Sequence, residues 1–392
     1  MREAREELLQ AADGLQKRLT DLSDDIFRNP ELGLKEEKTS AKMQALLKEA
    51  GFKIEPGIAG MPTAFSASLG TGSPKIALLA EMDALPEIGH GCGHNIAGTA
   101  SVGAGAALAA ILPKYLKPGS GTLVVLGTPA EELGKGKIEM CKAGVFDDID
   151  GAMMVHGSSK RKVIKNFLGL VRLNFVFHGK TSHAAAYPEE GVNALDALIL
   201  FFNSIGLLRQ QLRGDVRVHG IITDGGKAPN IIPDRAVASF YVRARDLKEL
   251  SSVRERVISC AQGAALSTGC TMDVAEVGDL NAPMKINRAF AEVYRRSLER
   301  LGLCEEYDSP EKSAGSSDIG NVSQMIPAIH PHVPIRQGIN IHTREFAQAT
   351  CSPDGHRALM EGVKALGLTA LELIFEPGAL EAVKKDFADN ID

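Results

Sequence analysis

Three short apolar segments, each followed by reactive polar residues, constrain the fold of this chain most strongly. They are Lys75–Ala80, Thr122–Gly127 and Gly151–Val155, and segments with helical spacing separate them. Continuous apolar strands that alternate with helices are typical of a largely parallel sheet with both faces covered. The sequence therefore predicts an α/β fold built on a mostly parallel sheet.

The longest uncharged segment runs from Ile96 to Leu112 and ends at Pro113. It is shorter than the ~20 apolar residues that a membrane-spanning helix needs, so we interpret it as a buried helix. Residues 3–50 predict two helices, interrupted by a turn at Arg28–Gly33. The N-terminus lacks the apolar core of a signal peptide.

Composition excludes several classes of protein. A chain of 392 residues is long enough for two domains, and its net charge of −5 argues against nucleic acid or acidic membranes as partners. Its six cysteines are scattered, without a C-x-x-C pair, which suits a reducing compartment. We therefore expect a cytoplasmic protein that binds neither nucleic acid nor membrane.

The pattern changes near Phe167. Strands and helices then follow in the ferredoxin-like order β-α-β-β-α-β, after which the apolar strand-helix style resumes with a helix at Ile286–Leu301. We predict an inserted α+β domain over residues 168–278, within an α/β domain formed by residues 1–167 and 279–392.

The stretch from Glu81 to Asn95 concentrates residues that bind metals: three acids, two histidines and one cysteine. Cys92 and His94 have a Cys-x-His spacing, which points both side chains to one side of an extended backbone. Alone, such a pair is more often a buried thiol beside a surface histidine. The metal interpretation therefore depends on further ligands.

Further ligands follow the other apolar strands. Asp83 comes after the first strand, Glu131 and Glu132 after the second, and His156 after the third. Ligands in open α/β sheets bind beyond the carboxyl ends of the strands, so these residues converge on one edge. Adjacent acids are usually a solvated turn, but beside a cation one carboxylate binds the ion while the other holds the water.

The candidate ligand set has five members, although each histidine alone would more often be structural: Cys92, His94, Glu132, His156 and His342. Five ligands are too many for one tetrahedral zinc with an open position. Two divalent ions ~3.5–4 Å apart that share the Cys92 thiolate fit better.

Several loops remain open to an ordinary interpretation as exposed turns: Thr181–Ala185, which contains His183, Gly225–Asn230, and Ser316–Asp318. Gly103-Ala-Gly105 lacks the third glycine of a dinucleotide-binding loop, and the chain has no G-K-[ST] phosphate loop and no G-x-S-x-G nucleophile elbow.

Eight ordered motifs between residues 81 and 346 resemble the aminoacylase and glutamate-carboxypeptidase family of two-metal peptidases, and most closely the amidohydrolase branch with the p-aminobenzoyl-glutamate hydrolases and β-alanyl-lysine dipeptidases. The motifs are E-M-D-A-L-P, G-H-G-C-G-H-N, T-P-A-E-E, M-V-H-G, G-K-T-S-H-A-A, N-I-I-P-D-R-A, G-S-S-D-I-G-N-V-S and I-H-T-R-E-F.

The resemblance implies the same five metal ligands, with zinc or manganese as the ions, Glu131 as general base and Asp83 as the residue that orients a ligand. It implies that the inserted domain is a lid that forms a homodimer, so that His183 reaches the partner's active site. It also implies that Asn230 and Arg243 hold the substrate, since a guanidinium grips a carboxylate bidentately.

Two positions depart from the family pattern. Glu81-Met82-Asp83 stands where the wider family has His-x-Asp, so whether Glu81 binds metal is open. Asn95 stands where many amidohydrolases have Asp, and we expect it to remove one negative charge near the ions.

The function expected from these residues is hydrolysis of the amide bond of an N-acyl amino acid or dipeptide. A water between the two ions gives its proton to Glu131 and attacks the carbonyl, and Glu131 returns the proton to the leaving amine. The alternative is a non-catalytic, dimeric metal-binding carrier or regulatory module for carboxylate ligands. Glu131 counts against it, because a carrier has no use for a base beside the ligand Glu132.

Overall fold

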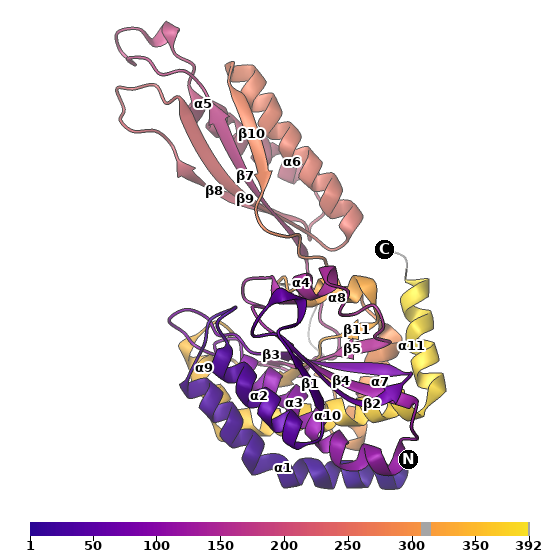
Figure 1. Ribbon diagram of the computed structural model, residues 1–392. Helices are drawn as coiled ribbons and strands as arrows, with labels where there is room; N and C mark the ends of the chain where they lie inside the picture. The colour runs from indigo at the N-terminus through magenta and orange to yellow at the C-terminus, as the bar shows by residue number, and fades with distance from the viewer. Residues whose placement is uncertain (307–314, 391–392) are drawn as a thin grey trace. The chain divides into compact units, whose positions relative to one another are not determined.

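The chain forms two compact units, which Figure 1 shows in a computed structural model whose described residues are 1–306 and 315–390. Unit 1 combines Met1–Asn166 with the segment from Met284 onward, and unit 2 is Phe167–Pro283. The units thus divide at 166/167 and 283/284, beside predicted boundaries at 167/168 and 278/279.

Unit 1 is built on a mixed sheet of six strands. Strand β3 is parallel to β4 on one side and to β5 on the other, and β5 is parallel to β11, whereas β1 and β2 form an antiparallel edge next to β4. In spatial order the strands are β1 (Lys53–Pro56), β2 (Phe65–Gly72), β4 (Ser120–Thr128), β3 (Lys75–Glu81), β5 (Gly151–Met153) and β11 (Ala328–Ile329). The sheet is mostly parallel, as predicted.

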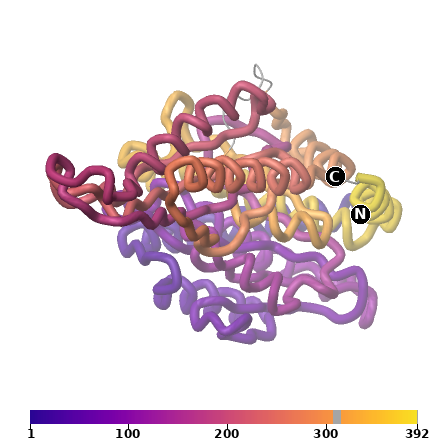
Figure 2. Tube along the Cα trace, turned by 90° about the horizontal axis from the view of Figure 1, so that it is seen from above, coloured from indigo at the N-terminus to yellow at the C-terminus, as the bar shows by residue number. Residues whose placement is uncertain are grey.

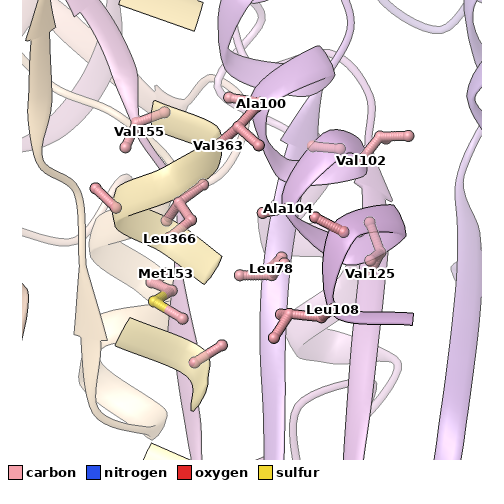
Figure 3. Close-up of a cluster of buried hydrophobic side chains, with 14 of the residues drawn as sticks. Leu78, Ala100, Val102, Ala104, Leu108, Val125, Met153, Val155, Val363 and Leu366 are labelled. Carbon is pink, nitrogen blue, oxygen red and sulfur yellow. The ribbon is translucent and has the colours of Figure 1, made fainter. Parts of the chain in front are cut away.

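Two long helices pack on this sheet: α3 (His94–Tyr115) and α10 (Pro353–Phe375). Figure 3 shows their side chains against Leu78, Val125 and Met153 of the three central parallel strands. Helix α3 is long and apolar enough to cross a membrane, yet 89% of its most apolar stretch is buried inside the protein. It is a core helix, as predicted, and it continues two residues beyond Pro113.

The other elements of unit 1 surround this core. Helix α1 packs along α3 and α10, and Arg5 near its start donates a hydrogen bond to Glu376 near the end of the chain (2.6 Å), so the indigo and yellow segments meet in Figure 2. These elements are α1 (Arg2–Arg28), α2 (Glu37–Glu49), η1 (Ile58–Gly60), α4 (Gly136–Lys142), β6 (His156–Ser158), α7 (Arg288–Arg300), α8 (Ile319–Met325), β12 (His332–Pro334), α9 (Arg344–Thr350) and α11 (Pro377–Asp389).

Unit 2 has its own antiparallel sheet and its own core. Its main elements, in chain order, are β7 (Gly169–His178), α5 (Ala194–Leu208), β8 (Arg217–Asp224), β9 (Arg235–Ala244), α6 (Leu247–Thr268) and β10 (Thr271–Glu276), and the sheet order is β10-β7-β9-β8. Both helices pack against β7 and β9, where the Phe201 ring contacts those of Phe175 and Phe240 at a tilt, with ring centroids 4.8 Å apart in each pair.

Candidate metal centre

The carboxyl ends of three parallel strands converge on one cluster of side chains in unit 1. β3 leads into Asp83, β4 into Glu131 and Glu132, and β5 into His156, as the sequence predicts from the direction of the strands. Potential ligand atoms gather here in overlapping groups, each within 4.8 Å: Cys92, His94 and His156; Cys92, Glu132 and His342; and His94, Glu131 and Glu132.

Cys92 lies at the junction of two of these groups. Its Sγ is 3.3 Å from Nε2 of His156 and 3.3 Å from Nε2 of His342. On the far side, Nε2 of His342 lies 3.9 Å from Oε2 of Glu132. One sulfur therefore faces two neighbouring sets of ligand atoms, which is the geometry that a bridging ligand requires.

Asp83 organises the cluster from behind. Its Oδ1 lies 3.1 Å from Nδ1 of His94, and its Oδ2 accepts a hydrogen bond from the backbone N–H of Glu132 at 2.9 Å. Nδ1 of His94 also lies 2.9 Å from the Asp83 carbonyl, so this nitrogen carries a proton, and Nε2 is the nitrogen that would present its lone pair to a bound metal ion.

His156 is oriented by the same rule. Its Nδ1 donates to the Gly157 carbonyl at 2.7 Å, which leaves Nε2 as an acceptor beside the Cys92 sulfur.

Two residues of the site have left-handed backbones without being glycine. Ala130, directly before Glu131, has φ 57°, and His342 has φ 64°. Such conformations cost about 1–3 kcal/mol and persist where the surroundings impose them. Ala130 N–H donates to Oε1 of Glu36 (2.8 Å), and His342 N–H donates to the Gly91 carbonyl (2.7 Å). The backbone is thus held in a strained form directly before one predicted functional residue, Glu131, and at another, His342.

The cluster carries more negative than positive charge. Burial acts to lower the pKa of His94, but Glu81 and Asp83 outweigh it and hold this pKa well above its usual value. Burial, followed by the charges of Glu81 and Asp318, raises the pKa of Glu131 well above its usual value. Both pKa values are raised, and the negative charge of neighbouring buried carboxylates contributes to each shift. A cation bound here would neutralise that charge.

The residues also fit a divalent metal by their unsatisfied atoms. Among the described residues, Oε2 of Glu81, Nε2 of His94 and Oε1 of Glu132 are buried without a hydrogen-bond partner. Buried lone-pair atoms of this kind are costly unless a proton or cation meets them. Thiolate, imidazole and carboxylate together are a ligand set suited to zinc-like ions.

Asn95, directly after His94, forms hydrogen bonds with residues outside the ligand cluster. Its side-chain amide donates to Oγ of Ser23 (3.1 Å) and Oγ1 of Thr350 (3.2 Å). These hydrogen bonds connect the start of α3 to α1 and α9, and the expectation that Asn95 lowers the charge beside the ions stays a prediction.

The remaining predicted residues lie in unit 2. His183 is exposed, and its Nδ1 accepts hydrogen bonds from the backbone N–H groups of Ala185 (3.3 Å) and Ala186 (3.1 Å). The backbone of Asn230 is adjacent, since its carbonyl accepts from Ala184 N–H at 3.0 Å. His183 and Asn230 therefore belong to one loop pair.

Arg243 lies at the other end of the same sheet. It pairs with Leu170 at the start of β7, whereas the His183 loop follows the end of β7, where His178 pairs with Arg235. Arg243 lies eight positions after Arg235 along β9, which corresponds to ~26 Å of extended strand.

Sequence reasoning missed two residues beside the cluster. Lys137 and Asp318 are fully buried and form an ion pair at 2.6 Å. Asp318 lies in a Gly/Ser-rich loop that was open to interpretation as a plain turn, but G-S-S-D-I-G-N-V-S is one of the family motifs and was the available signal. Nothing in the sequence around Lys137 distinguishes it from a solvated lysine.

Known proteins are similar to this chain over nearly its whole length. The model of peptidase family M20/M25/M40 matches residues 77–380. The chain is 37% identical to the Xaa-Arg dipeptidase of Mus musculus, covering 98% of this chain and 91% of the relative. It is 27% identical to a p-aminobenzoyl-glutamate hydrolase polypeptide of Escherichia coli (strain K12), covering 94% of this chain and 92% of that relative.

A solved structure supports the fold. The YXEP protein of Bacillus subtilis, described as a dinuclear metal binding peptidase, superposes with a TM-score of 0.74 at 20% identity and covers 92% of this chain and 99% of its own. With the family model and these relatives, the resemblance read from the motifs is confirmed: the chain belongs to peptidase family M20/M25/M40 and is a metal-dependent hydrolase of amide bonds.

Proposed function

We propose that this enzyme cleaves the amide bond of dipeptides or N-acyl amino acids with Glu131 as its general base. The observation that carries the proposal is the position of Cys92 between two groups of ligand atoms, with Glu131 in the adjoining group beside His94. Two divalent ions, zinc or manganese, would be held by five side chains: Cys92, His94, Glu132, His156 and His342. When bound, these ions acidify a water molecule and polarise the substrate carbonyl.

Glu131 moves the proton in this reaction. Its carboxylate takes a proton from the attacking water and returns it to the leaving amine, a role worth ~10²–10⁴-fold in rate. The two glutamates divide the work because Asp83 holds the backbone of Glu132, and the left-handed turn at Ala130 directs Glu131 separately.

Asp83 keeps the imidazole of His94 in one tautomer. Because its carboxylate and carbonyl both face Nδ1 of that ring, Nε2 is the nitrogen that would bind an ion.

His183 supplies a donor for the developing oxyanion. Since its Nδ1 already accepts two backbone N–H groups, the neutral ring carries its proton on Nε2, which is a hydrogen-bond donor on an exposed side chain.

We further propose that unit 2 is the lid and the dimerisation unit. A dipeptide is at most ~7 Å long, whereas ~26 Å of strand separates the ends of β9 that carry the Asn230 loop and Arg243. If His183, Asn230 and Arg243 all contact one small substrate, they come from two copies of the chain. Analytical ultracentrifugation tests the dimer.

The substrate class follows from the arginine and from the relatives. A guanidinium binds a carboxylate bidentately, so we expect a free carboxylate on the leaving amino acid. The mouse relative is named for dipeptides ending in arginine and the E. coli relative for an acylated glutamate, so both classes belong in the assay.

Six free cysteines support a cytoplasmic location, which cell fractionation tests.

The decisive experiment compares Glu131→Ala with Glu132→Ala. Dipeptides and acyl amino acids are assayed with added Mn²⁺, Zn²⁺ or Co²⁺, and bound metal is counted by mass spectrometry. Glu131→Ala should lose turnover with its metal content unchanged, whereas Glu132→Ala should lose metal. Metal loss in Glu131→Ala would mean that the two roles are exchanged. Wild-type protein that binds substrates tightly but turns over none would instead be the carrier.

A further inference from the structure

Lys137 is a buried cation beside the metal centre that none of the proposed catalytic steps uses. Its side chain is fully buried, and its Nζ lies 2.7 Å from Oε1 of Glu81 and 2.6 Å from Oδ1 of Asp318. Its backbone N–H donates to the other oxygen of Asp318 at 2.9 Å. One residue thus binds Asp318 twice and Glu81 once.

The acids around Lys137 resemble a metal site. Carboxylate oxygens of Glu81, Glu131 and Asp318 lie within 4.8 Å of one another, and Oε2 of Glu81 is fully buried without a hydrogen-bond partner among the described residues. Converging carboxylates are what divalent cations such as Mn²⁺ and Mg²⁺ bind. The ammonium group of Lys137 stands where such an ion would be needed.

Oε2 of Glu81 gives a second indication. It lies 3.2 Å from Nε2 of His94, and among the described residues neither atom has a hydrogen-bond partner. Glu81 therefore faces both the Lys137 ammonium and the side of the centre where His94 presents its lone pair. One oxygen of the Glu81 carboxylate thus binds Lys137, and the other faces the candidate metal centre.

The backbone fixes the lysine in this place. A Cβ on Gly136 would lie 1.7 Å from the Pro129 carbonyl oxygen, so only glycine lets the start of α4 approach the segment that carries Glu131 so closely. Helix α4 also packs on α8, whose first turn follows Asp318. Lys137 is therefore positioned by contacts of the main chain and not by a flexible loop.

We propose that the Lys137 ammonium is a permanent cation of this centre, which fills the acidic cluster of Glu81, Glu131 and Asp318 and keeps a third metal ion out of it. A metal ion in the cluster would occupy the Glu131 lone pairs that proton transfer needs. The effect on proton transfer rests on the proposed function of Glu131, whereas the exclusion of the third ion by Lys137 does not.

The lysine stays charged at neutral pH. Burial acts to lower its pKa, and the charges of Asp318 and Glu81 outweigh burial and raise this pKa above its ordinary value. As a positioning residue, Lys137 acts on catalysis only through these acids and needs no contact with substrate.

The test is a metal count. Wild type, Lys137→Met, Lys137→Arg and Lys142→Met, which removes an exposed lysine of the same helix, are loaded with Mn²⁺, freed of excess ion and counted by mass spectrometry. We expect Lys137→Met to hold one ion more per subunit than wild type, and both other variants to match wild type. An unchanged count in folded Lys137→Met overturns the proposal.

A second measurement and a second variant keep the proposal testable if Lys137→Met fails to fold. If Lys137→Met is insoluble without metal, we expect added Mn²⁺ to restore it and raise its melting temperature by more than it raises that of wild type. Lys137→Met combined with Asp318→Asn removes one acid with its partner, and it should fold and bind no extra ion. An extra ion in this double variant, or no rescue of the single one by Mn²⁺, refutes the proposal.

Activity separates this inference from the proposed function. Rising Mn²⁺ should inhibit Lys137→Met and leave wild type active, since the extra ion captures Glu131. If Glu131→Ala proves active, Glu131 is not the base and the proposed mechanism fails. The comparison of bound ions between Lys137→Met and wild type would still test the role of Lys137 independently.

Discussion

Gly98 holds helix α3 against the back of the metal centre, and replacing it by alanine should damage both stability and metal binding. A Cβ at this position would lie 2.1 Å from the Glu81 carbonyl oxygen and 2.6 Å from the Met43 methyl group. Carbon and oxygen atoms ordinarily stay about 3.3 Å or more apart, so the helix and the strand must separate by roughly 1 Å. The Glu81 carbonyl belongs to a strand and cannot rotate away.

Two effects of opposite sign determine how much Gly98→Ala changes the free energy of unfolding. Alanine favours a helix over glycine by about 1 kcal/mol, whereas overpacking costs about 1–3 kcal/mol and more against rigid backbone. We expect Gly98→Ala to lower the free energy of unfolding by about 1–2 kcal/mol. His94 lies one turn earlier on α3, so the same shift moves its ring relative to Asp83 and should reduce bound metal.

Gly14→Ala on α1 is the matched control, because nothing lies within 4 Å of a Cβ there, and it should gain about 1 kcal/mol. The chain has no tryptophan, so urea unfolding is followed by far-UV circular dichroism, and the transition of unit 1 is compared. Gly98→Ala with the midpoint of Gly14→Ala and a full complement of metal would refute the reasoning.

Three further substitutions test single contacts. Asp83→Asn should weaken metal binding about 10–100-fold, because it disturbs the acceptor behind a ligand histidine, and a chelator competition that finds wild-type affinity would contradict this. Cys92→Ser should lose metal by mass spectrometry, since a serine hydroxyl stays protonated, whereas Cys260→Ser, outside the centre, should keep it. Arg161→Met leaves the buried Glu361 without its bidentate partner and should cost about 3–5 kcal/mol in urea unfolding; a loss under 1 kcal/mol would disprove the assignment.

The part of the centre that follows from strand direction could be predicted from sequence. Parallel strands end at a common edge, so the residues after β3, β4 and β5 had to meet, and Asp83, Glu132 and His156 do. The Cys-x-His pair and His342 joined them because their residue types suit the same ion.

What could not be predicted depends on contacts between distant segments. Lys137 and Asp318 are separated by 181 positions, and each alone resembles a solvated charge, so only the packing of α4 on α8 reveals a buried pair. Strand β1 was missed because Lys53–Pro56 is short and mostly exposed, with no apolar alternation. It extends the antiparallel edge of the sheet, where β2 is already antiparallel to β4.

The role of Asn95, a motif residue, also depends on contacts with distant segments. Its replacement by aspartate distinguishes an effect on the ions by charge from a structural role through hydrogen bonds. If residue 95 acts on the ions by charge, Asn95→Asp should change metal affinity. In the structure its amide donates to Ser23 and Thr350, and the Thr350 hydroxyl already donates to the Ala347 carbonyl, so an aspartate would bury a charge to which Thr350 has no proton to donate. We therefore expect a loss of at least about 1–3 kcal/mol in stability, with metal affinity unchanged. A stable variant with altered metal affinity would show that this side chain acts on the ions across the first turn of α3.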